Sequence, residues 1–134
     1  MVKLKYILLA FILLPCLCSS QDFGIIGIEK DTVIAVLKKS NVAITFSPDS
    51  IAQKYFDFTS KGRPETRCLL DGTKIKIVQT VHDFVQYDKQ KEFFDNNFTI
   101  VKDAEDRWLH REPYGRFKVA IIQQGNIFII EIKK

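Results

Sequence analysis

Two histidines, His82 and His110, have the widest chemical range of any residues in this 134-residue chain. With the nearby acids Asp83 and Asp106 they could supply an acid–base pair or ligands for a metal ion. A zinc site needs three or four ligands, often at short and regular spacings. The sequence contains no His-x-x-x-His and no Cys-x-x-Cys pair. We therefore expect no metal site and no cofactor, with both histidines at strand ends.

Cys68 could act as a nucleophile if a histidine lay within hydrogen-bond reach of its thiol. The dipeptide Asp71-Gly72 predicts a tight hairpin turn, which places Cys68 opposite Ile75 and leaves His82 seven residues farther along the strand. At ~3.3 Å per residue, about 20 Å separates the two. We therefore expect no cysteine catalysis. The leucine neighbours of Cys68 indicate a small buried hydrophobic residue instead.

Aromatic and basic residues gather around a predicted turn at Pro113 and Gly115, where proline presets φ and glycine closes the turn. Tryptophan, tyrosine and arginine dominate binding hot spots. The alternative is that the tryptophan packs in the core, since tryptophan is highly buried on average, while the arginines are ordinary surface residues. The pattern indicates a candidate protein-binding site made of Trp108, His110, Arg111, Tyr114 and Arg116.

Residues 1–20 have the order of a cleavable secretory signal: two lysines, an apolar run, and small residues before a predicted cut after Ser20. A membrane anchor needs ~20 apolar residues, and this run is shorter. Lipidation at Cys16 or Cys18 is a further alternative, although bulky residues precede both cysteines. A native core helix is the last alternative. We expect a secreted or periplasmic protein that begins at Gln21.

Removing residues 1–20 leaves eighteen basic and sixteen acidic residues, a net charge of +2. Acids alternate with these basic residues along most of the chain, so the sequence predicts no nucleic-acid partner. Only Cys68 remains, which excludes an intrachain disulfide, so the core alone must hold the fold. Residues 21–134 are expected to form a single domain with no membrane span after signal cleavage.

The C-terminal part predicts a four-stranded antiparallel meander over residues 97–132. Its strands are rich in β-branched and aromatic residues, and Gly125 can take the positive φ of a tight turn. The predicted strands cover 98–101, 107–111, 117–122 and 127–132. A second hairpin is expected around Asp71-Gly72, between residues 67–70 and 73–78.

Three helices, and a strand over residues 42–46, are expected in the remaining segments. One runs to Lys39 with Asp31 or Thr32 as its N-cap, and another covers 84–96 with Asp83 as its cap. Ser47-Pro48-Asp49 has the residues of a helix start, followed by an apolar stripe of Ile51, Tyr55 and Phe56. The predicted fold class is α+β, an antiparallel sheet with about three helices packed on one side.

These patterns favour an exported, non-catalytic binding or accessory protein of the cell envelope, which engages a protein partner through residues 108–116. An inhibitor that inserts its 111–116 turn into a partner is a variant of this function. A small ligand carrier is one alternative, since eleven phenylalanines could line an apolar cavity. A small secreted hydrolase or metal-dependent enzyme using His82 and His110 is the other.

Overall fold

A computed structural model of the chain describes residues 24–48, 54–59, 64–112 and 115–134. The predicted signal at residues 1–20 and the predicted binding residue Tyr114 lie outside the described residues. The elements in chain order are α2 (Lys30–Lys39), β1 (Ile44–Phe46), β2 (Tyr55–Phe58), β3 (Thr66–Asp71), β4 (Lys74–Asp83), the 3₁₀ turn η2 (Phe84–Gln86), α3 (Tyr87–Asn97), β5 (Thr99–Ile100), β6 (Arg107–Glu112), β7 (Gly115–Gln124) and β8 (Ile127–Lys133).

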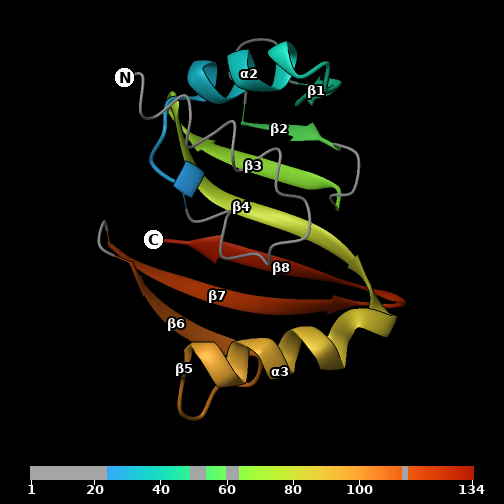
Figure 1. Cartoon of the computed structure of the whole chain (residues 1–134), viewed down its shortest axis with the longest axis vertical. Coiled ribbons are helices and arrows are strands. Elements are labelled where there is room, and N and C mark those ends of the chain that lie inside the picture. The colour runs from blue at the N-terminus through green and yellow to red at the C-terminus, as the bar shows by residue number, and fades with distance from the viewer. Residues whose placement is uncertain (1–23, 49–53, 60–63, 113–114) are drawn as a thin grey trace.

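All eight strands belong to one antiparallel sheet in the order β1-β2-β3-β4-β8-β7-β6-β5 (Figure 1). The predicted α+β class and the C-terminal meander of β5 to β8 are confirmed. The sheet is larger than predicted, because β2 joins β1 to the hairpin of β3 and β4 and because β4 pairs with β8.

The prediction of about three helices is wrong, since the described residues contain two α-helices, α2 and α3. The supposed third helix began at Ser47 and included Tyr55 and Phe56, which instead belong to β2. Residues 49–53 of that segment lie outside the described residues. In β2, buried Phe56 and Phe58 alternate with partly exposed Tyr55 and Asp57. This period of two favours a strand with one buried face over the helix-start signal upstream.

A helix followed by a four-stranded meander occurs twice along the chain, first as α2 with β1 to β4 and then as α3 with β5 to β8. The innermost strands β4 and β8 pair with each other, and the other strands follow outward in the same order on both sides. The arrangement is symmetric about the pair Val78–Ile132. The sequence shows no internal repeat, so the relation between the halves is visible only in the fold.

The core lies on one face of this sheet, where a single apolar row of directly opposite residues crosses all eight strands. Its six inner members are at most 2% exposed, whereas its two end members are 37% and 57% exposed. The burial of Cys68 confirms its predicted role as a small core residue. The row consists of Phe46, Phe56, Cys68, Val78, Ile132, Val119, Trp108 and Ile100.

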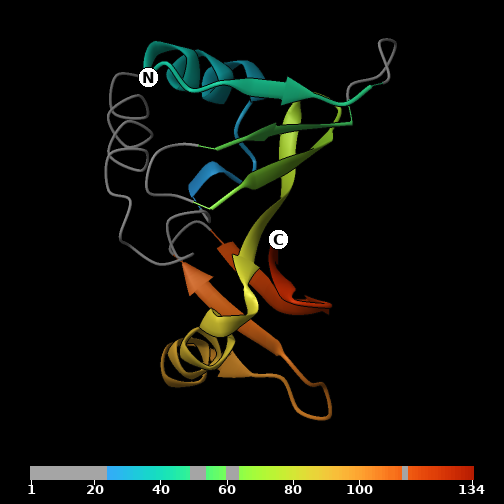
Figure 2. The same ribbon diagram turned by 90° about the vertical axis from the view of Figure 1, so that its right-hand side faces the viewer.

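Both helices lie on this core face, α2 at the β1 end of the sheet and α3 at the β5 end (Figure 2). α3 buries Phe94, whose ring centroid lies 5.0 Å from that of Trp108. The other face, which we call the outer face, carries the alternate residues such as Arg67 and Glu131, and no described helix covers it (Figure 2).

In the described part of the chain, the helices are too short or too polar to cross a membrane.

The helix starts differ in how well the sequence predicts them. Asp83 is confirmed as a cap, because its side chain accepts a hydrogen bond from the Val85 amide and a helix follows through η2 and α3. The predicted cap of α2 is wrong: Glu29 is the N-cap, without a side-chain hydrogen bond. Backbone bonds from Gly27 to Ile75 and from Lys30 to Thr73 fix that start instead.

The Asp71-Gly72 hairpin forms as predicted, but its register differs. Asp71 pairs with Lys74, so the turn consists of Gly72, at φ +63°, and the residue after it. A register shift between residues 69 and 70 then places Cys68 opposite Val78 rather than Ile75. The β7–β8 turn is also shorter than predicted, since residue 124 pairs with residue 127.

Candidate functional site

His82 lies in β4 on the core face and takes part in the packing under α3. Its ring stacks on Phe128 with centroids 5.1 Å apart, and Nε2 lies 2.7 Å from the buried Thr80 hydroxyl. Partial burial lowers the pKa of His82 to about 4, so the ring is neutral near pH 7. A neutral histidine that stacks on a core aromatic and bonds to a hydroxyl is part of the fold's packing.

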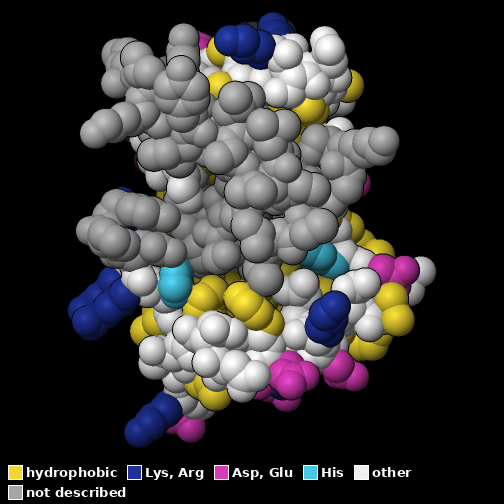
Figure 3. All heavy atoms as spheres, in the orientation of Figure 1, with side chains coloured by type: hydrophobic (Ala, Val, Ile, Leu, Met, Phe, Trp, Pro, Cys, Tyr) yellow, Lys and Arg dark blue, Asp and Glu magenta, His cyan; other side chains and the backbone are white. Residues whose placement is uncertain are grey.

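The two histidines do not form a common site. His82 lies opposite Phe128, which lies opposite Gln123 of β7, whereas His110 lies opposite Phe117 of the same strand. Six residues of strand separate these positions on β7, or about 20 Å. Figure 3 shows the histidine side chains as two separate patches on the face of Figure 1. An enzyme that needs both rings at one reacting centre does not fit this geometry.

We expect the folded protein to lose stability between about pH 6.5 and pH 4. The folded pKa of His82 is about 4, below its ordinary value of 6.5, so in this range the unfolded chain binds a proton that the folded chain does not. After a discount for partial exposure, the loss is about 2 kcal/mol. Urea unfolding at a series of pH values measures it.

Replacing His82 with glutamine should remove this part of the pH dependence, while His110→Gln, as the matched control, should leave the contribution of His82 in place. An unchanged slope in the His82 variant would show that the ring is not held neutral by packing.

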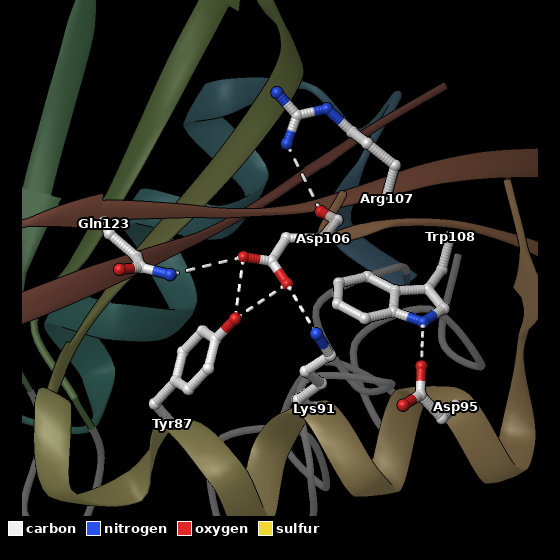
Figure 4. Close-up of polar contacts among 7 residues, drawn as sticks. All are labelled: Tyr87, Lys91, Asp95, Asp106, Arg107, Trp108 and Gln123. Atoms are coloured by element: carbon white, nitrogen blue, oxygen red, sulfur yellow. Dashed lines mark hydrogen bonds and ion pairs between the residues drawn. The ribbon is translucent and has the colours of Figure 1, made fainter. Parts of the chain in front are cut away.

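A carboxylate network joins α3 to the strands through Asp106 (Figure 4). The Tyr87 hydroxyl donates to this carboxylate at 2.8 Å, Lys91 Nζ lies 3.4 Å from Oδ1, and Gln123 Nε2 donates to Oδ2 at 3.4 Å. Partial burial, and then the bond to Asp106, raise the pKa of Tyr87. The Asp106 side chain is 10% exposed and surrounded by donors. Its oxygens are engaged in fastening the helix, which leaves Asp106 with a structural role.

The candidate binding residues of the 108–116 hairpin are divided between the two faces of the sheet. Trp108 is 2% exposed on the core face, and its Nε1 donates to Asp95 Oδ1 at 2.9 Å (Figure 4). His110 shares that face, and its ring centroid lies 4.3 Å from that of Phe98. Arg111 and Arg116 lie directly opposite each other, both exposed, on the outer face. The two arginines are therefore brought together, and Trp108 and His110 are not with them.

Two further lysines, which sequence reasoning missed, continue this group of exposed cations. Lys118 lies two residues after Arg116 on β7, so both side chains are on the outer face. Lys133 lies opposite Lys118 on β8. The period-two spacing of Arg116 and Lys118 could have placed both on one face of the strand. The pairing of Lys118 with Lys133 could not be predicted without the correct β7–β8 register. We call the four residues Arg111, Arg116, Lys118 and Lys133 the cationic strip.

No group of three or more histidine, cysteine, aspartate or glutamate side chains in the described ranges is arranged to hold a metal ion. Comparisons with protein-family models, with curated proteins and with solved structures found no match for this chain.

Proposed function

We propose that this chain is an exported, non-catalytic binding or accessory protein of the cell envelope that engages a protein partner through the outer face of its C-terminal half. Its place of action is secreted or periplasmic, supported by the signal-like order of residues 1–20. The main support for binding is the outer face, which no described helix covers and where exposed arginines and lysines gather beside Leu109, 38% exposed. Arginine beside apolar surface is typical of protein interfaces.

A non-catalytic role is supported by what the candidate acid–base groups do in the fold. His82 stacks in the core, His110 lies about 20 Å away by strand spacing, Asp83 caps η2, and Asp106 fastens α3. His82, Asp83 and Asp106 therefore have structural tasks, and the two histidines lie too far apart to act together.

A bulky maleimide label on Leu109→Cys should abolish capture of a stoichiometric partner from envelope extract, because the label covers the outer face. Cys16 and Cys18 leave with the predicted signal, and Cys68 is fully buried and should not react. The matched control is the same label on Ala35→Cys, an exposed position of α2, which should keep capture intact. The exported protein should have the mass of a chain that begins at Gln21.

Two results would contradict the proposal. Capture of no partner by the unlabelled protein would argue against a binding function. Equal capture by both labelled variants would place the binding surface away from the outer face.

A further inference from the structure

The cationic strip sets like charges directly opposite one another on three neighbouring strands. Arg111 faces Arg116, and Lys118 faces Lys133. The Ile121 amide donates a hydrogen bond to the Asp106 carbonyl, just before β6 begins. Hydrogen-bonded and non-hydrogen-bonded pairs alternate along antiparallel strands, so the even-numbered residues of β6 form hydrogen bonds with β7 and the odd-numbered ones do not. Arg111 and Arg116 therefore form a non-hydrogen-bonded pair, the type in which facing side chains are closest. Like charges in such positions destabilise a sheet.

The other half of the sheet provides an internal comparison. Relative to the central pair Val78–Ile132, Arg67 on β3 occupies the position that Lys118 occupies on β7. Arg67 faces Asp57, and the two form bonds of 2.8 and 3.0 Å. Lys118 faces Leu109 instead. The acid that neutralises the first cation is thus replaced by an aliphatic residue at the second.

Arg67 and Lys118 also differ in the charge of the residue that faces them from the central strands β4 and β8. Arg67 faces neutral Gln79, whose amide bonds to Glu131, whereas Lys118 faces Lys133. Lys133 lies 3.8 Å from the Glu131 carboxylate, which already accepts the Gln79 bond. Within the described side chains, no acid pairs with Arg111, Arg116 or Lys118. One half of the outer face is therefore compensated in charge, and the other keeps a repulsive cluster of cations.

We propose that the cationic strip docks an acidic, extended segment of a partner protein, an inference that rests on the proposed binding function and gives that partner its chemistry. Carboxylates placed over the strip relieve the repulsion between the facing cations, and arginine binds carboxylates with two parallel bonds. The Arg111–Arg116 and Lys118–Lys133 rows lie two residues apart on β7, about 7 Å. Alternate residues of an extended strand have the same spacing, so acids at every second position match both rows.

A fluorescent peptide of alternating glutamate and threonine is the probe, and anisotropy titration of the purified protein gives its affinity. Lys118→Glu is expected to weaken binding about tenfold or more, and rising salt should weaken wild-type binding. Arg67→Glu, at the equivalent and compensated position, is the matched control and should change affinity by no more than about twofold, since Arg67 lies outside the strip. A peptide with lysine in place of glutamate should not bind.

The melting temperature of Lys118→Glu is a second readout. If Lys118 only stabilised the fold, its replacement would lower the melting temperature. Lys118→Glu turns repulsion from Lys133 into attraction, so its melting temperature should equal or exceed that of the wild type. A lower melting temperature would overturn the claim that the strip is a repulsive cluster.

Equal peptide affinity in the wild type and Lys118→Glu would overturn the docking proposal, as would stronger binding to anionic phospholipid vesicles than to the peptide. If the label on Leu109→Cys blocks partner capture while the acidic peptide does not bind, the binding function stands and the acidic partner is wrong. If neither effect is seen, both are wrong.

Discussion

Replacing Trp108 with alanine is expected to lower the free energy of unfolding by about 3–5 kcal/mol. The indole is 2% exposed and packs against Phe94 at 5.0 Å, so truncation leaves a cavity between α3 and the sheet. It also removes the donor that bonds to Asp95 at 2.9 Å. Urea unfolding followed by far-ultraviolet circular dichroism measures the loss, since Trp108 is the only tryptophan and its fluorescence disappears with it.

Two neighbouring substitutions separate packing from the hydrogen bond. Trp108→Phe keeps an aromatic ring but loses the bond, and should cost about 1–2 kcal/mol. Leu109→Ala alters the next residue, which is 38% exposed on the outer face, and should cost less than about 1 kcal/mol. If Trp108→Ala cost as little as Leu109→Ala, the indole would not be a core group, and the sequence-based assignment of Trp108 to a binding surface would be favoured.

Local signals in the sequence predict those parts of the fold that depend on neighbouring residues. The C-terminal meander follows from strands that are consecutive in the chain and rich in β-branched and aromatic residues. The Asp83 cap depends on a side chain two residues from the amide it binds. The β4–β8 pairing that joins the two meanders has no turn between its strands. Long-range pairing of this kind leaves no local mark, so the full extent of the sheet could not be predicted.

Competing signals explain the third helix that does not form and the different register of the Asp71-Gly72 hairpin. The proline after Ser47 favours a helix start, but burying Phe56 and Phe58 on one face of the sheet requires a strand. Packing of an apolar face outweighs a capping preference, which contributes only about 1 kcal/mol. The register shift between residues 69 and 70 breaks the alternation in one strand, and a turn signal cannot reveal it.

The cationic strip could be predicted only at the turn between β6 and β7, where the expected turn matches the structure. Arg111 and Arg116 are brought together by the short hairpin, as their spacing around Pro113 indicates. A four-residue β7–β8 loop over 123–126 would have set Arg116 opposite Lys133. The shorter turn moves the pairing by two residues and sets Lys118 there. A shift of two residues preserves which face each side chain occupies but changes its partner. The Arg111–Arg116 pair could therefore be predicted from the sequence, whereas the pairing of Lys118 with Lys133 could not.

Asp106→Ala is expected to cost about 3 kcal/mol of unfolding free energy. Asp106 has φ +55°, a left-handed conformation in which alanine is strained by about 1 kcal/mol. Its carboxylate also holds Tyr87, Lys91 and Gln123, and losing it leaves a tyrosine hydroxyl without its partner. Asp106→Asn tolerates the same φ and keeps one acceptor oxygen, so it should cost about 1–2 kcal/mol.

Asp103 provides the matched control for Asp106, because it lies in the same turn at φ +61° and its side chain is exposed. Asp103→Ala should cost only the backbone strain, about 1 kcal/mol. The difference between the two alanine variants, measured by urea unfolding, then reports what the Asp106 carboxylate contributes to fastening α3. If the two variants were equally stable, the bonds to Tyr87, Lys91 and Gln123 would add nothing to the fold. Asp106 would then be retained in this turn for its left-handed backbone alone.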